Sequence, residues 1–194
     1  MYLMNFFMSL MMNKEGTSWY ETITYSDDMV LEQGDILFGC PYYDTTGEEV
    51  NGVINAKIVD HNVVIMTQSC DIANKKVDKI FVAPWEYISA VIRKKEEADG
   101  ELNTKKKKSF FKHLSEGVMP SFHLLDEDKE KGLDDYLVID FSNTFTISPG
   151  TMMATAAKQG SVIRLKSPYK EHLSQAFARF FMRVGLPSNL VNPF

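Results

Sequence analysis

The sequence has little cysteine, no surplus of positive charge and no apolar run long enough to cross a bilayer. Its two cysteines, Cys40 and Cys70, are too few for a disulfide framework and do not have the spacing of a zinc knuckle. A net charge of -5 argues against a protein that coats nucleic acid or anionic lipid through bulk electrostatics. We therefore expect a cytoplasmic protein with no membrane segment.

The chain is long enough for one packed core, and its composition is that of an ordinary globular protein. Its 194 residues are 44% hydrophobic and 24% charged, so the composition favours neither a disordered nor a fibrous protein. Residues 1–18 are apolar, but Asn5 and Ser9 interrupt them and no cationic segment precedes them. We interpret residues 1–18 as an extension of the domain. Three explanations for them stay open: a degraded signal peptide, an extra packing strand or helix, and a start codon upstream of the domain. The predicted single domain covers residues 19–194 and consists of a barrel half (19–85), a helical and charged insertion (86–135), and strands with a C-terminal helix (136–194).

The first half of this domain has the pattern of short antiparallel strands. Runs of β-branched and aromatic residues alternate with turn residues between positions 31 and 85. A turn is predicted at Asp60-His61-Asn62, between strands at 52–59 and 63–67. Such short strands close most easily on one another, so the predicted fold class is α+β with a small antiparallel barrel.

The second half predicts helices and further strands, the first of them at 121–125. Residues 85–97 have a helical pattern, and the lysine-rich residues 98–108 predict a solvated loop or helix face. Strands are predicted at 136–141 and 161–165. An amphipathic C-terminal helix follows, with Ser167 as its N-cap. Its apolar stripe is predicted to pack on the sheet and contains Tyr169, Leu173, Ala176, Phe177, Phe180 and Val184.

The segments Gly34-Asp35-Ile36, Val63-Val64-Ile65-Met66-Thr67 and Ile80-Phe81-Val82-Ala83-Pro84 resemble the opening of the MazF/PemK-like family. That family consists of small SH3-like barrels of bacteria and phages, many of them RNA-cleaving toxins. The resemblance covers about residues 31–85 and implies an SH3-like, PemK-like barrel in a toxin–antitoxin or phage-defence setting. It transfers no catalytic residue. The family's arginine and its Ser or Thr fall where this chain has Asp60, His61 and Asn62, and then Trp85 and Glu86.

The segment Gln68-Ser69-Cys70-Asp71 is the first candidate site, because it groups polar side chains and a thiol after a predicted core strand. A thiolate nucleophile needs a neighbouring base, and His61 or His123 could supply it. The structural alternative is that Cys70 is a small buried side chain and that Asp71 caps a turn. The catalytic candidates are Cys70, Asp71, His61 and His172.

The polar face of the C-terminal helix is the second candidate site. His172, Gln175, Arg179 and Arg183 follow one another at spacings of three or four, and two arginines one turn apart could clamp a phosphate or carboxylate. The alternative is a solvated helix face. We expect residues 68–71 to share one concave surface with Arg179 and Arg183. No pair of histidines or cysteines has a recognised metal-ligand spacing and no phosphate-binding glycine loop is present, so no metal or cofactor is predicted.

Three functions are consistent with these features, and whether the chain is an enzyme stays open. The leading one is a binding or regulatory module. The second is an endoribonuclease in which His61 or His172 is the general acid or base and Arg179 or Arg183 stabilises the phosphorane. The third is an interaction subunit of a larger complex. A protein, an RNA or a second copy of the chain could be the partner, and a membrane is not expected.

Overall fold

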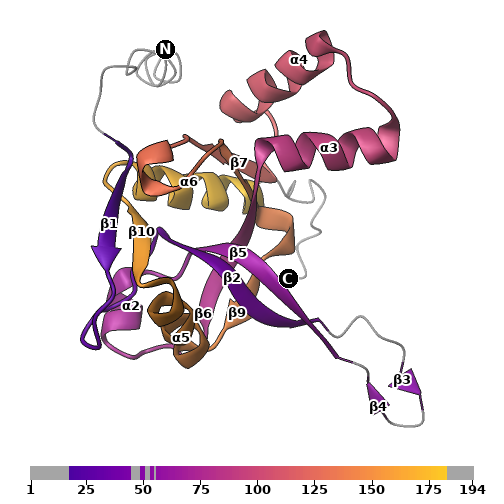
Figure 1. Ribbon diagram of the computed structural model, residues 1–194. Coiled ribbons are helices and arrows are strands. Elements are labelled where there is room, and N and C mark those ends of the chain that lie inside the picture. Colours follow the sequence, from indigo (N-terminus) through magenta and orange to yellow (C-terminus); the bar gives the residue numbers. More distant parts are fainter. Residues whose placement is uncertain (1–17, 45–48, 51–52, 55, 183–194) are drawn as a thin grey trace, which may run out of the picture.

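The computed structural model describes residues 18–44, 49–50, 53–54 and 56–182, with a mostly antiparallel sheet at its centre (Figure 1). The sheet order is β1-β10-β2-β5-β6-β8-β7, and β9 also pairs with β6. The predicted mixed α+β class is confirmed, and the described strands follow an open path from β1 to β7. The strands of this sheet are β1 Tyr20–Thr24, β2 Asp35–Asp44, β5 Lys57–Ile65, β6 Ile80–Tyr87, β7 Phe122–Leu125, β8 Leu137–Asp140, β9 Phe145–Ile147 and β10 Ser161–Leu165.

The remaining elements are helices and one separate strand pair. In Figure 1, helices α5 and α6 lie beside the sheet, and α3 and α4 form a pair that projects from it. Their bounds are α2 Ser69–Ala73, α3 Ile88–Asp99, α4 Thr104–Ser115, α5 Pro149–Gln159 and α6 Tyr169–Phe181, with 3-10 turns η1 Lys129–Lys131 and η2 Phe141–Asn143, and the strand pair β3 Glu49–Val50 with β4 Val53–Ile54. No helix in the described part of the chain has the length and hydropathy needed to span a membrane.

The turn predicted at residues 60–62 is wrong, because β5 continues through it. His61 pairs with Cys40 of β2, and the register shifts between Leu37 and Cys40. At this irregularity Asn62 accepts a hydrogen bond from the backbone N–H of Gly39 through Oδ1, at 3.0 Å. The turn-forming residues therefore accommodate a β-bulge instead of ending the strand.

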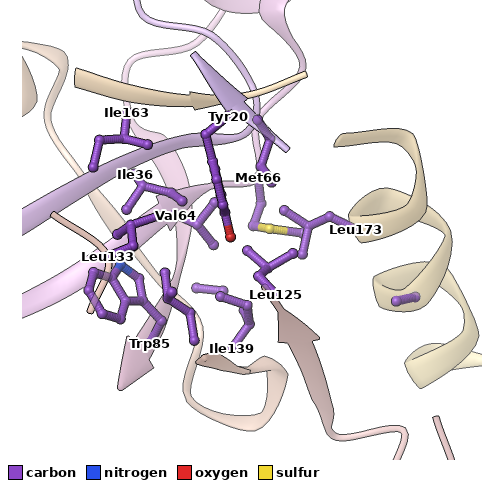
Figure 2. Close-up of a cluster of buried hydrophobic side chains, with 14 of the residues drawn as sticks. Tyr20, Ile36, Val64, Met66, Trp85, Leu125, Leu133, Ile139, Ile163 and Leu173 are labelled. Atoms are coloured by element: carbon purple, nitrogen blue, oxygen red, sulfur yellow. The ribbon is translucent and has the colours of Figure 1, made fainter. Parts of the chain in front are cut away.

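Both faces of the central sheet are buried, which explains the uninterrupted apolar runs in the sequence. On β5, Val63 and Ile65 belong to the core cluster that includes Met152 of α5. Val64, between them, belongs to the opposite cluster with Leu173 of α6. Successive side chains of a strand alternate between faces, so a strand covered on both sides needs apolar residues at every position. Figure 2 shows the α6-side cluster, where Met66 lies between Tyr20 and Leu173.

The predicted C-terminal helix is present as α6 and packs on the sheet as expected. Leu173 is fully buried, and Phe177 and Phe180 pack against the same core cluster. The predicted cap is wrong in detail, because the Ser167 hydroxyl donates to the Glu171 carboxylate at 2.7 Å instead of accepting from a backbone N–H. Val184 and the predicted helix stop at 185–187 lie outside the described residues.

The segment after β6 differs from the sequence prediction at its start. Because β6 extends to Tyr87, Trp85 is a buried strand residue and the helix begins at Ile88. The lysine-rich segment forms the first turns of α4, and Asn103 caps it by accepting from the Lys106 N–H at 3.0 Å. The sequence reading did not identify α5, β1 or β9.

Gly34 allows the turn before β2 to approach β10 and α6 closely. Its φ is +85°, a conformation that side chains with a Cβ rarely adopt. A Cβ at this position would lie 3.0 Å from the Leu165 Cβ and 3.2 Å from the Lys170 Cβ. The backbone bonds from Gly34 to Ile65 and from Leu165 to Gly34, at 2.9 and 3.0 Å, hold the turn in this position.

Candidate functional site

A buried ion pair lies beneath the turn that precedes β2. Asp35 is 0% exposed and accepts two hydrogen bonds from Arg164 of β10, at 2.6 Å from Nε and 2.9 Å from Nη2. The Arg164 Nη1 also donates to Glu32 at 2.6 Å, and Nη2 to the Val30 carbonyl at 3.0 Å. Burial raises the pKa of the Asp35 carboxyl, against the opposing effect of the Arg164 hydrogen bonds. The pair therefore ties the 30–35 segment to β10.

The sequence reading missed Arg164, although a signal was present. An arginine in the middle of the apolar strand Ser161–Leu165 can be buried only if acidic or carbonyl groups accept its hydrogen bonds. Asp35 in the Gly34-Asp35 turn supplies one of those acceptors. The sequence had predicted only a backbone turn at this position.

Residues 68–71 pack against this same turn through Ser69. The Ser69 hydroxyl accepts from the Gln33 backbone N–H at 3.1 Å and donates to the Glu32 carboxylate at 3.5 Å. Lys170 of α6 also approaches Glu32, at 4.0 Å. The segment is therefore fixed to the ion-pair network and to the first turn of α6.

Cys70 is exposed, so its expected alternative role as a small buried side chain is wrong. Its Sγ lies 3.7 Å from the Gln68 Oε1 and 3.7 Å from the Asp71 Oδ1, which are both hydrogen-bond acceptors. Asp71 forms an ion pair with Lys76 at 3.6 Å. The buried cysteine is Cys40, where desolvation raises the thiol pKa to about 11.

Arg179 and His172 of α6 are close enough to His123 of β7 for their charges to act on its ring. The desolvation of the His123 ring lowers its pKa to about 4, and the charges of Arg179 and His172 add to this effect. We call these three residues the histidine–arginine cluster. Arg179 follows Lys170 by nine positions, which is about 13 Å along a helix axis.

The structure therefore brings residues 68–71 to the beginning of α6, whereas the charge of Arg179, further along the same helix, acts on His123. Arg183, the other arginine predicted to share this surface, lies outside the described residues.

His61 contributes to a third location, which the sequence reading did not identify as a site. Its ring lies 5.3 Å from that of Phe145 and 6.0 Å from that of Tyr42, and the Tyr42 and Phe145 rings are 4.3 Å apart. These three rings line an open groove of about 710 Å³. We call it the aromatic groove; its other lining residues are Asp44, Pro84, Trp85, Glu86, Val91, Lys94, Phe122, Val138, Asp140, Ser142, Asn143 and Thr144.

The polar groups of the aromatic groove are held in fixed positions. Asp140 accepts from the Ser142 backbone N–H at 2.8 Å and from the Asn143 side chain at 2.7 Å. Lys94 of α3 forms an ion pair with Glu86 of β6 at 2.5 Å. No single segment of the sequence could reveal this groove, because its lining comes from the β2–β5 ribbon, β6, α3, β7, β8 and the turn before β9.

The described residues contain no group of three or more His, Cys, Asp or Glu side chains arranged to hold a metal ion. The size of the aromatic groove is typical of sites for small molecules or peptide side chains. Comparison of the sequence with protein-family models and with curated proteins finds no match.

Proposed function

We propose that this chain is a cytoplasmic binding or regulatory module and that the aromatic groove is its binding site. The observation that carries the proposal is a groove of about 710 Å³ in which aromatic and aliphatic side chains lie among polar and charged ones. Trp85 and Val138 are almost fully buried beneath it, so the floor is part of the folded core. Preformed concavities that combine apolar surface with precisely placed polar groups are the usual form of a ligand site.

The groups in the groove favour binding over covalent catalysis. Among the described residues, His61 makes ring contacts with Tyr42 and Phe145 and no hydrogen bond to a hydroxyl or carboxylate that would orient it as a base. The thiol of Cys70 does not line the groove. A nucleophilic mechanism needs a nucleophile and an oriented base within hydrogen-bond reach.

A fragment screen followed by NMR tests this proposal on the full-length protein. Neutral, cationic and anionic fragments should shift the Trp85 indole and Val138 resonances in the groove. Ser142→Tyr places a bulky ring at the exposed rim and should abolish these shifts, whereas Ser109→Tyr, on the exposed surface of α4, is the matched control. Fragments that shift only residues outside the groove, or a Ser142→Tyr variant that binds them normally, would contradict the proposal.

We also propose kinship with the MazF/PemK-like barrels for residues 31–85, and with it a toxin–antitoxin or phage-defence setting. What supports the kinship is that β2, β5 and β6, which carry the resembling segments, are adjacent antiparallel strands. Fold alone does not determine function, so the setting is tested separately, by the effect of expressing the chain on cell growth.

An endoribonuclease is the second candidate function, and the histidine–arginine cluster favours it. Two histidines near an arginine are the groups needed to take the proton of an RNA 2′-hydroxyl, to protonate the leaving 5′-oxygen and to stabilise the phosphorane. Cleavage of a labelled RNA that is lost in His172→Ala and Arg179→Ala, and kept in the surface control Arg93→Ala, would establish this function. An uncleaved RNA would exclude it.

A further inference from the structure

We propose that the exposed side of α4 binds the phosphate backbone of duplex DNA without reading its base sequence. The side chains that make this contact are Lys105, Lys106, Lys108 and Lys112, which we call the lysine surface. No residue of α4 lines the aromatic groove, so this second site is independent of the function proposed for that groove.

α4 concentrates positive charge in a protein whose net charge is -5. Its 12 residues include five lysines and no carboxylate. Lys105 and Lys108 are exposed and form no ion pair within the described part of the chain. Lys106 is exposed as well, and its charge acts on Asp99 without an ion pair. α4 therefore keeps positive charge that the fold itself does not neutralise.

The lysine surface occupies one side of the helix. At about 100° per residue, its four lysines fall within an arc of about 160°. The opposite side of α4 consists of Phe110, Phe111 and Leu114, which pack in one cluster with Val138 of β8. The Lys112–Glu116 pair, at 3.7 Å, is exposed and therefore weak. No large apolar side chain of α4 is exposed, so its outer side offers mainly positive charge and hydrogen-bond donors.

The lysines of α4 do not serve the stability of the helix. The first turn of a helix favours acidic side chains, whereas that of α4 contains lysines and no acidic residue. Contacts with α3 and a cap hold this turn in place nonetheless. Glu96 accepts from Lys107 at 2.8 Å and from the Leu102 N–H at 3.1 Å, and Asn103 accepts from the Lys106 N–H at 3.0 Å. The lysine surface is therefore fixed on a helix pair that projects from the sheet (Figure 1).

This chemistry favours a nucleic-acid backbone over a membrane or a protein. Amphipathic helices bind membranes through a free apolar face, and protein interfaces depend on buried apolar and aromatic anchors. The apolar side of α4 is already used inside the fold. Contacts to phosphates require only positively charged or polar donors, and they carry no sequence information.

The shape of the site favours a DNA duplex among nucleic acids. Single strands are usually held by stacking on exposed aromatic rings, and α4 exposes none. The major groove of B-form DNA is about 12 Å wide and admits a helix, whereas that of A-form RNA is deep and narrow. A helix on a projecting pair can approach such a groove with its lysines toward the phosphates.

Fluorescence anisotropy of a labelled DNA duplex of about 16 base pairs tests the proposal on the full-length protein. At about 50 mM salt we expect a micromolar dissociation constant, and a slope of log K against log salt of about -3. Lys105→Gln/Lys108→Gln should weaken binding about tenfold or more and reduce the slope by about 2. Lysine and glutamine have similar helix propensities, so its circular dichroism spectrum should be unchanged.

Two control variants accompany this measurement. Lys79→Gln/Lys158→Gln removes the same charge from exposed positions outside α4 and should bind within about twofold of the unmodified protein. Lys105→Arg/Lys108→Arg keeps the charge and should bind normally. Equal losses in the two glutamine variants, or no binding of the unmodified protein, would overturn the proposal.

Three competing ligands distinguish the partner. Tighter binding of phosphatidylserine vesicles, or of polyglutamate, would identify a membrane or an acidic protein segment as the partner and overturn the assignment to DNA. Equal affinity for an RNA duplex of the same sequence would overturn the argument from groove width and with it the choice of DNA. None of these outcomes alters the test of the aromatic groove.

Discussion

The buried ion pair between Asp35 and Arg164 offers the sharpest test of how the fold is held together. Asp35→Ala removes the acceptor of two guanidinium hydrogen bonds, at 2.6 and 2.9 Å, and of a third from the Glu32 N–H at 2.8 Å. Arg164 would remain buried in β10 with only Glu32 and the Val30 carbonyl as partners. We expect a large loss of stability, because half of a buried pair is left behind.

The magnitude follows from the burial of both partners. Removing one member of a buried ion pair typically costs about 3–5 kcal/mol. Because Glu32 continues to compensate Arg164, we expect the lower end, about 3 kcal/mol. For a chain of this size, 1 kcal/mol corresponds to about 2–4 °C in Tm, so the melting temperature should fall by about 6–12 °C.

Urea denaturation followed by circular dichroism measures this loss. The double variant Asp35→Leu/Arg164→Met should be more stable than Asp35→Ala, since no unpaired charge is left buried. Lys95→Met breaks the exposed Lys95–Asp99 pair, at 2.8 Å, and as the control should cost less than about 1 kcal/mol. If the free energy of unfolding of Asp35→Ala lies within about 1 kcal/mol of that of the unmodified protein, the expected role of this network is refuted.

Three further predictions concern the core and its titration. The folded pKa of His123, about 4, lies below the ordinary value of 6.5, so the unfolded state takes up a proton first as the pH falls. Stability should therefore decline by up to about 3 kcal/mol between pH 6.5 and 4, and His123→Gln should lack this component in denaturation curves measured at each pH. Gly34→Ala should lower the free energy of unfolding by more than about 1 kcal/mol, and by more than Gly39→Ala does. Both glycines have a positive φ, but of the two only position 34 would place an added Cβ against other side chains. Equal melting temperatures of the two glycine variants would count against the close approach. Leu173→Ala should lower the free energy of unfolding in urea titrations by about 2–5 kcal/mol, and Phe180→Ala should lower it by less. The reason is that Leu173 is fully buried whereas Phe180 is partly exposed. The reverse order would mean that α6 packs through another face.

Local patterns in the sequence determined several elements of this fold. The amphipathic stripe around Leu173 predicted α6 and its buried face, and the apolar run at 161–165 predicted β10. These predictions succeeded because helix amphipathicity and continuous apolar strands depend on neighbouring residues alone. The uninterrupted apolar run Val63-Val64-Ile65 is likewise the pattern of a strand that is buried on both faces, as β5 is.

The errors occurred where a distant partner satisfied the backbone or side chain. Asp60, His61 and Asn62 have turn propensity, but pairing with β2 and the Asn62–Gly39 hydrogen bond keep them in a strand. Pairing of Trp85 with Ile139 of β8 extended β6 beyond the predicted helix start in the same way. Such tertiary pairings override local propensity.

The sequence by itself determined the α+β class, the C-terminal helix and the polarity of segments such as 68–71. Only the tertiary structure decided which polar groups meet: Arg164 with Asp35, and Ser69 with the Gln33 turn. The aromatic groove depends wholly on that assembly, because Tyr42 and Phe145 are about a hundred positions apart in the chain. Spacing along a chain reports contacts within one helix or strand, whereas contacts between elements are set by how their buried faces pack.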